Sequence, residues 1–209
     1  MAFVATEPTA GAVDFYQVDT LGPGPLAGLA TGPTSRGFLA FPGLEFRGYD
    51  YNLGGGAFIY AKSSGTITPG TVVELSDTVT NGRYDVTATA WQGTAQSGKT
   101  LAVAISTLTV NQFGWYQVEG NAVTTVSGAP VSGNSLYWQA NGIVAPTVVA
   151  SKQVINAVFG SAVSAVIGAG TASLVAYSPS TIPQQQAGTL SATQAIVLLN
   201  RPAAQSQIL

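Results

Sequence analysis

The chain has 209 residues, only sixteen of which are charged (seven Lys and Arg, nine Asp and Glu), and its formal net charge is −2. It contains no histidine and no cysteine. These counts argue against most acid–base and nucleophilic catalysis, against zinc sites, and against nucleic-acid binding, which needs clustered Lys and Arg. We therefore expect a protein that is not an enzyme and takes no cofactor or metal ion.

The composition is 46% hydrophobic, and the chain is long enough for one large β domain or two small ones. No apolar run reaches the length of a membrane-spanning helix, and the first residues do not form a signal peptide. An 8% charged content is low for a free monomer. The surface is either covered by neighbouring subunits, which we favour, or coated with uncharged polar residues.

Residues 1–45 are rich in Gly and Pro, which predicts an extended arm. Several aromatic residues are scattered through it, and a solvated linker would not need them. We predict that these aromatic residues bind a partner. They are Phe3, Phe15, Tyr16, Phe38 and Phe41. The arm either docks on a neighbouring subunit or folds back over its own core.

A period-2 pattern of apolar residues begins at residue 57 and predicts strands. Asn81-Gly82 is typical of a two-residue β-hairpin turn. The segment 151–167 is ambiguous, because its Ala-rich spacing is also compatible with a helix, although its Val and Ile content favours strands. The predicted strands are 57–62, 71–75, 83–91, 101–105, 115–120, 121–126, 136–139, 143–149, 154–159 and 195–199.

Many short strands separated by Gly and Pro turns predict an all-β fold, a β-barrel or β-sandwich of short antiparallel strands with an extended N-terminal arm. We expect the arm at 1–45, a β domain at 46–202 and a C-terminal tail at 203–209. The closing strand is predicted to stop at the sequence Asn-Arg-Pro of residues 200–202.

Candidate chemical sites are sparse. The run Gly54-Gly55-Gly56 lacks the Lys and Ser or Thr of a phosphate loop, so we expect a bend where two backbones approach closely. Glu45 and Asp50 lie near Tyr49 and Tyr51, as in sugar sites, but we favour the explanation that they are solvated loop charges.

Asp77 and Asp85 flank Asn81 and could bind a calcium ion, although they too are explained as loop charges. Trp115 and Tyr116 are adjacent and should point to opposite faces of a strand. We expect one ring in the core and the other at an interface, so both are candidate partner-binding residues.

Half of the chain resembles the head decoration (capsid cement) proteins of tailed bacteriophages. The resemblance covers 45–130 and 195–202. It is carried by Phe-Ile-Tyr-Ala-Lys at 58–62, by Ile-Thr-Pro-Gly-Thr-Val-Val at 67–73, by 102–106 with Gln-Phe-Gly-Trp-Tyr-Gln-Val-Glu-Gly at 112–120, and by Ile-Val-Leu-Leu-Asn-Arg-Pro at 196–202. The long arm and the segment 135–190 depart from the simpler members.

This resemblance implies a virion structural protein, made in the host cytoplasm, that sits on the outer capsid surface and stabilises the shell. Its expected partners are the major capsid protein and further copies of itself, as a homotrimer, with no nucleic acid and no membrane. The arm would tie to adjacent subunits, as in strand addition. An alternative is a carbohydrate-binding or adhesin module of a phage tail or cell surface, suggested by Tyr49, Tyr51 and Tyr60 and by the neutral Ser, Thr and Gln content.

Overall fold

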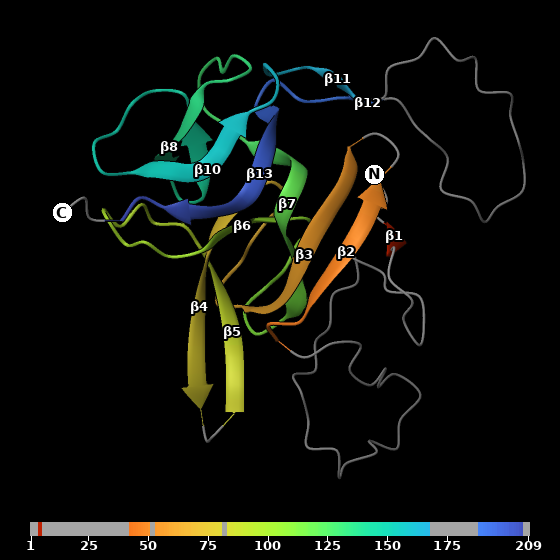
Figure 1. Cartoon of the computed structure of the whole chain (residues 1–209), viewed down its shortest axis with the longest axis vertical. Coiled ribbons are helices and arrows are strands. Elements are labelled where there is room, and N and C mark those ends of the chain that lie inside the picture. The colour runs from red at the N-terminus through yellow and green to blue at the C-terminus, as the bar shows by residue number, and fades with distance from the viewer. Residues whose placement is uncertain (1–3, 6–41, 51–52, 81–82, 168–187, 207–209) are drawn as a thin grey trace, which may run out of the picture.

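The computed structural model describes residues 4–5, 42–50, 53–80, 83–167 and 188–206, and the regular elements in these ranges are β-strands (Figure 1). They are β1 (Val4–Ala5), β2 (Glu45–Asp50), β3 (Gly54–Ser63), β4 (Val72–Thr80), β5 (Arg83–Ala90), β6 (Leu101–Ala104), β7 (Phe113–Thr125), β8 (Ser135–Ala140), β9 (Ile143–Ala145), β10 (Gln153–Phe159), β11 (Val166–Ile167), β12 (Gly188–Thr189) and β13 (Gln194–Ala204). Across the described ranges there is no helix long and apolar enough to cross a membrane. The prediction of an all-β protein is confirmed.

The sheet partly closes on itself. Its eleven strands follow the order β1-β2-β3-β5-β4-β6-β7-β13-β10-β8-β9, and β3 also pairs with β7. The strands β3, β5, β4, β6 and β7 therefore form a ring, and β13, β10, β8 and β9 extend from β7 as a flank. The ring contains a short parallel pairing of β3 with β5, so the sheet is mixed. The result is barrel-like at the ring but is not a simple barrel.

The ring encloses small side chains. Its core includes Ala57 and Ala61 of β3, Ala88 of β5, and Ala102 and Ala104 of β6. A ring of five strands has a narrow interior, because the diameter of a closed sheet grows with the number of strands. Alanine at these positions leaves room for the larger residues of the same cluster, which are Ile67, Val73, Leu75, Val86, Leu108, Tyr116 and Val118.

The flank encloses larger side chains. Its core contains Trp91, Leu101, Leu136, Phe159 and Leu199, all buried. Strand β13 contributes alternate residues to this core, as a strand with one covered face must. The buried set is Ala195, Val197 and Leu199, and the intervening set is Ile196, Leu198 and Asn200.

A third cluster covers the outer face of β3 and β7. Phe58 and Tyr60 of β3 lie there with Phe113 and Trp115 of β7. The Tyr60 and Trp115 ring centroids are 5.2 Å apart, and those of Phe46 and Trp115 are 5.5 Å apart in an edge-to-face arrangement. Both faces of the ring wall made by β3 and β7 are therefore covered.

Strand β7 is longer than predicted, because the two strands expected at 115–120 and 121–126 are one strand of 13 residues. It passes from the ring to the flank at Gly120, which has φ +93°. A Cβ atom at Gly120 would lie 2.2 Å from the carbonyl oxygen of Gly55. The close backbone approach predicted for residues 54–56 is found here, but these glycines lie within β3 rather than in a bend before it.

The hairpin prediction is confirmed by the pairing of Thr80 with Arg83, which leaves the two-residue connection 81–82. The segment 151–167 contains strands β10 and β11. The predicted end of the closing strand is wrong, since β13 continues through Arg201, which has φ +50°, to Ala204. Ala203 and Ala204 therefore belong to the sheet rather than to a tail, because their backbones still pair with β10.

Candidate interaction face

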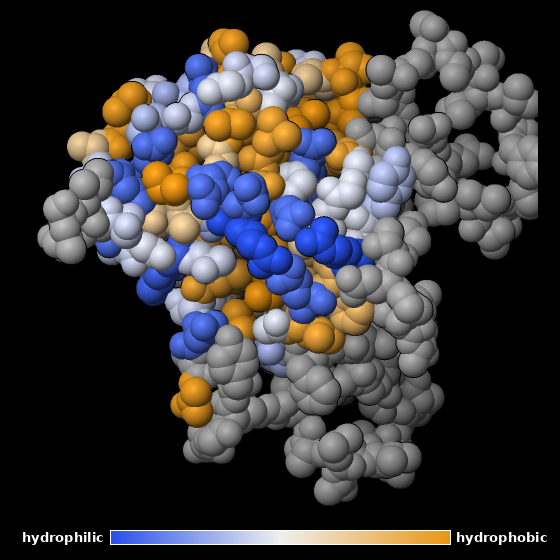
Figure 2. Space-filling model, in the orientation of Figure 1, coloured by the Kyte–Doolittle hydropathy of each residue, from blue (hydrophilic) through white to orange (hydrophobic). Residues whose placement is uncertain are grey.

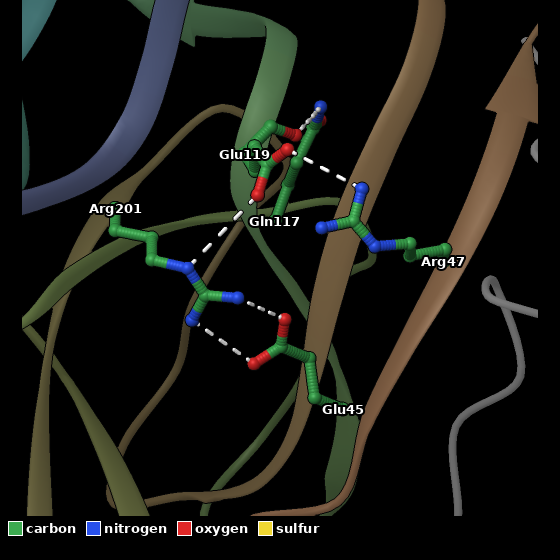
Figure 3. A network of polar contacts seen from close by, with 5 residues as sticks. All are labelled: Glu45, Arg47, Gln117, Glu119 and Arg201. Atoms are coloured by element: carbon green, nitrogen blue, oxygen red, sulfur yellow. Dashed lines mark hydrogen bonds and ion pairs between the residues drawn. The ribbon is translucent and has the colours of Figure 1, made fainter.

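A cluster of four charged residues joins three strands on one face of the molecule (Figure 3). The guanidinium of Arg201 in β13 donates to both carboxylate oxygens of Glu45 in β2, at 2.5 and 3.1 Å. Arg47 Nη1 lies 3.5 Å from Glu119 Oε1, and Arg201 Nε lies 3.9 Å from Glu119 Oε2. We call Glu45, Arg47, Glu119 and Arg201 the charged cluster; its formal charge is zero.

Backbone geometry brings these side chains together. Glu45 and Arg47 are two residues apart on β2 and therefore lie on one face of that strand. Glu119 stands opposite Asn200, the neighbour of Arg201, where β7 pairs with β13. Buried Gln117 donates its side-chain amide to the carbonyl oxygens of Glu119 at 3.1 Å and of Asn121 at 3.0 Å, which supports the bend of β7.

Hydrogen bonding to Glu45 raises the pKa of Arg201 above its ordinary value, so the cation is maintained at every relevant pH. Both arginine side chains are 56% exposed, and exposed ion pairs contribute little stability, about 0.2–1 kcal/mol each. Charged groups held in fixed positions on a surface contribute more to partner specificity and to association rate than to folding.

An apolar strip lies beside the charged cluster. Val158 of β10 stands directly opposite Leu198 of β13, with exposed fractions of 38% and 46%, and Ile155 is 37% exposed. We call Ile155, Val158 and Leu198 the apolar strip. Figure 2 shows hydrophobic atoms over β10 and β13, bordered by a hydrophilic band that crosses toward β2. An exposed apolar area with a polar border is typical of a protein-binding surface.

The predicted partner-binding pair Trp115 and Tyr116 does point to opposite faces of β7. Trp115 lies in the outer aromatic cluster and Tyr116 in the ring interior, and their exposed fractions are 2% and 0%. The prediction that one of the two rings is exposed for a partner is wrong, because β7 is a central strand with both faces covered. Phe3, Phe15, Tyr16, Phe38 and Phe41 lie outside the described residues.

The predicted sugar site and the tyrosines of the adhesin alternative lie only partly within the described residues, and the side chain of Asp50 is not among them. Glu45 is engaged by Arg201, and Tyr60 is buried against Trp115, so neither offers a free surface to a sugar. Tyr49 is exposed, whereas Tyr51 lies outside the described ranges.

The two aspartates of the predicted calcium site do not come together, and Asn81 lies outside the described residues. Asp77 pairs with Val86 and Asp85 pairs with Thr78, which puts the two aspartates on opposite faces of the β4–β5 hairpin. Within the described ranges no three His, Cys, Asp or Glu residues are grouped closely enough to hold a metal ion.

The charged cluster and the apolar strip were missed from the sequence for different reasons. Glu45 and Arg201 are 156 positions apart, so no local pattern joins them. The strip had a usable signal: residues 195–199 are apolar without alternation, which means that both faces of the strand carry apolar side chains.

No known protein family matches the chain, and no curated protein matches it. Among solved structures, the N base of the head fiber gp8.5 of bacteriophage phi29 is similar to it, with a TM-score of 0.41 and 8% sequence identity. The match covers 72% of this chain and 98% of the fiber base.

Proposed function

We propose that this chain is a structural protein of a bacteriophage virion that decorates the outer capsid surface. It acts by binding rather than by catalysis: it contacts the major capsid protein and neighbouring copies of itself, expected as a trimer, and so stabilises the shell. The sequence resemblance to head decoration proteins motivates this assignment. The apolar strip beside the charged cluster is the observation that supports binding as the activity.

The two parts of this face have different tasks. Burying Ile155, Val158 and Leu198 against a partner removes apolar surface from water, which provides affinity. The charged cluster carries both signs in fixed positions, so it selects a partner surface with a complementary arrangement. Because the net charge of the cluster is zero, it is not attracted to a uniformly anionic or cationic surface. This fits a protein partner with a defined arrangement of charges.

The test is co-sedimentation of the full chain with capsids assembled from the cognate major capsid protein. Leu198→Asp should weaken binding by about tenfold or more, since it introduces a charge at the centre of the strip. Val148→Asp is the matched control, because Val148 is 72% exposed and lies in the loop after β9. Equal capsid binding by the wild type and Leu198→Asp would overturn the assignment of this face.

A second experiment addresses the arm. Deletion of residues 1–40 is expected to reduce capsid attachment or subunit association, since the arm is proposed to tie adjacent subunits together. Unchanged attachment and association would contradict that mechanism. A glycan array on the same preparations separates the adhesin alternative, which requires glycan binding that Tyr49→Ala abolishes.

A further inference from the structure

Strands β10 and β13 are irregular at the same point of their shared ladder. Between two successive pairs of this ladder, one residue of β10 lies opposite three residues of β13. The single residue is Asn156, and the three are residues 200–202. Asn156 has φ +60° and Arg201 has φ +50°, so both strands bulge where they face each other.

The left-handed backbone of these two residues is unusual for its position. Of the described residues other than glycine that have positive φ, Asn156 and Arg201 are the two that lie within strands. The others lie in turns or loops and are Gln96, Asn111, Ser151 and Ser164. Asparagine tolerates this conformation, whereas it is unfavourable for arginine. A strained residue at a bulge favours a functional role, since bulges commonly redirect a side chain toward a binding site.

The bulge keeps the arginine side chain out of the flank core. Every second residue of β13 from Ala195 to Leu199 is buried, and the same alternation would bury residue 201. Instead Asn200 and Arg201 are consecutive exposed residues. Although β7 and β3 lie between β13 and β2, the redirected guanidinium reaches Glu45 of β2 (Figure 3). The unfavourable conformation therefore presents this guanidinium on the interaction face, which carries the charged cluster and the apolar strip.

The contacts of Arg201 indicate the kind of group that it can bind. A guanidinium has five N–H donors, and Glu45 accepts one from Nη1 and one from Nη2. Nε lies 3.9 Å from Glu119, so two carboxylates already balance the positive charge. Among the described residues the second N–H of each Nη has no acceptor, which leaves it available to a partner. A third carboxylate would be repelled by the two glutamates, so an uncharged oxygen is the better acceptor.

Two amide side chains stand beside the guanidinium. Asn200 precedes Arg201, Asn156 lies in the facing bulge of β10, and both side chains are exposed. Neither amide is hydrogen-bonded to another described residue, so each offers two N–H donors and a carbonyl acceptor. The next pair along the ladder is Val158 with Leu198, of the apolar strip. Donor groups beside an apolar area suit a main-chain segment, because its carbonyl oxygens are uncharged acceptors.

We propose that Arg201, assisted by Asn156 and Asn200, is the specificity-determining residue of the interaction face and binds main-chain carbonyl oxygens of the capsid protein. This inference rests on the proposed function and names the chemical group that is recognised. The strained backbone of Arg201 is retained because it serves binding rather than folding. Removing the strain and the guanidinium together should therefore weaken binding without weakening the fold.

The test measures both properties on the full chain with Arg201→Gly, since glycine adopts a left-handed backbone without strain. The urea midpoint should stay within about 0.3 M of the wild type or rise, because the relief of strain offsets the loss of an exposed ion pair. Co-sedimentation with capsids should show a dissociation constant raised by about tenfold or more. Gln96→Gly is the matched control, because Gln96 has φ +56° in the loop between β5 and β6. Its capsid binding should equal that of the wild type.

Two further variants test the chemistry of recognition. Arg201→Lys keeps the positive charge but lacks the planar fork of donors, so it should bind capsids as weakly as Arg201→Gly. Asn200→Asp replaces donors by a carboxylate that repels carbonyl oxygens, and it should weaken binding about fivefold.

Wild-type capsid binding by Arg201→Gly or by Arg201→Lys, or tighter binding by Asn200→Asp, would overturn the inference and leave the proposed function standing. A large fall in the urea midpoint of Arg201→Gly would also overturn it, because the bulge would then serve the fold. If the wild type itself does not sediment with capsids, the proposed function fails, and recognition of the capsid protein by Arg201 fails with it.

Discussion

The two halves of β7 lie in different surroundings. Residues Phe113–Val118 are all buried, because they form a wall of the ring whose inner and outer faces are both covered. Beyond Gly120, where β7 pairs with β13, buried and half-buried residues alternate, because one face packs on the flank core and the other, which carries Val123, is only partly covered by the outer aromatic cluster. The ring wall made by β3 and β7 is thus covered on both faces, whereas the outer face of the flank carries the exposed apolar strip. The second half of β7 adjoins β13, which carries Leu198 of the apolar strip.

The most severe way to break this arrangement is Gly120→Ala, at the junction of the two halves. The new Cβ would lie 2.2 Å from the Gly55 carbonyl oxygen, and the residue already has φ +93°. Since backbone atoms must move to relieve the contact, we expect a loss of about 5 kcal/mol in the free energy of unfolding, enough to prevent folding. The yield of soluble protein and its circular dichroism spectrum measure the effect.

Gly54→Ala separates the effect of an unfavourable backbone φ from the effect of a steric clash. Gly54 has φ +84°, but a Cβ there meets no atom within 4 Å. Only the unfavourable φ remains, which should cost about 1 kcal/mol. If Gly54→Ala were as damaging as Gly120→Ala, the close approach of β3 to β7 would not be the cause.

Substitutions at two adjacent residues of β10 compare how much the inner and outer faces of the flank contribute to stability. Phe159 is fully buried in the flank core, so Phe159→Ala should lower the free energy of unfolding by about 3–5 kcal/mol. Val158 is 38% exposed in the apolar strip, and Val158→Ala should lower it by less than about 1 kcal/mol. Urea denaturation followed by fluorescence of the tryptophans measures both. Equal losses would show that the outer face is not open.

The smallest effect at neutral pH concerns Tyr116, in the ring interior. Burial raises the pKa of its phenol above the ordinary value of about 10, and the nearby Ser63 hydroxyl opposes this in part. Because the pKa of Tyr116 is higher in the folded than in the unfolded state, this residue contributes its full stabilisation below about pH 10. That contribution is lost as the pH rises toward the pKa of the folded state.

Tyr116→Phe removes this titration. The wild type should lose stability relative to Tyr116→Phe above about pH 10, while the difference between them stays constant below it. Urea denaturation at a series of pH values measures this difference. The same change at exposed Tyr49 controls for the loss of a phenol, and a parallel response in both variants would contradict the burial argument.

The sequence predicted the strands well where local chemistry decides them. The Asn81-Gly82 turn placed the connection between β4 and β5 correctly, since turn geometry is a local property, although β4 continues to Thr80, beyond the strand expected at 71–75. It could not reveal the ring, because the pairing of β3 with β7 joins segments that are distant in the chain. Nor did it reveal that β7 continues through Gly120, since the pattern predicted two separate strands at 115–120 and 121–126.

The interaction face was predicted least well. Aromatic type suggested an exposed Trp115 or Tyr116, but exposure depends on the covering strands, which sequence pattern does not give. The strip residues Val158 and Leu198 are ordinary strand residues, and their exposure follows from β10 and β13 lying side by side with one face uncovered. A face is thus predictable only after the strand order is known.

The placement of β13 has a consequence for synthesis of the chain. It is the last described strand, yet it pairs with both β7 and β10 and so joins the rest of the flank to the ring. Strands β10, β8 and β9 therefore lack this connecting strand until the ribosome has released residues 194–204. Contacts between such distant segments form slowly, and unpaired strands are exposed while they wait. The ring can assemble on the nascent chain, whereas the flank folds only after translation has passed its last strand, with its apolar surfaces open to chaperones until then.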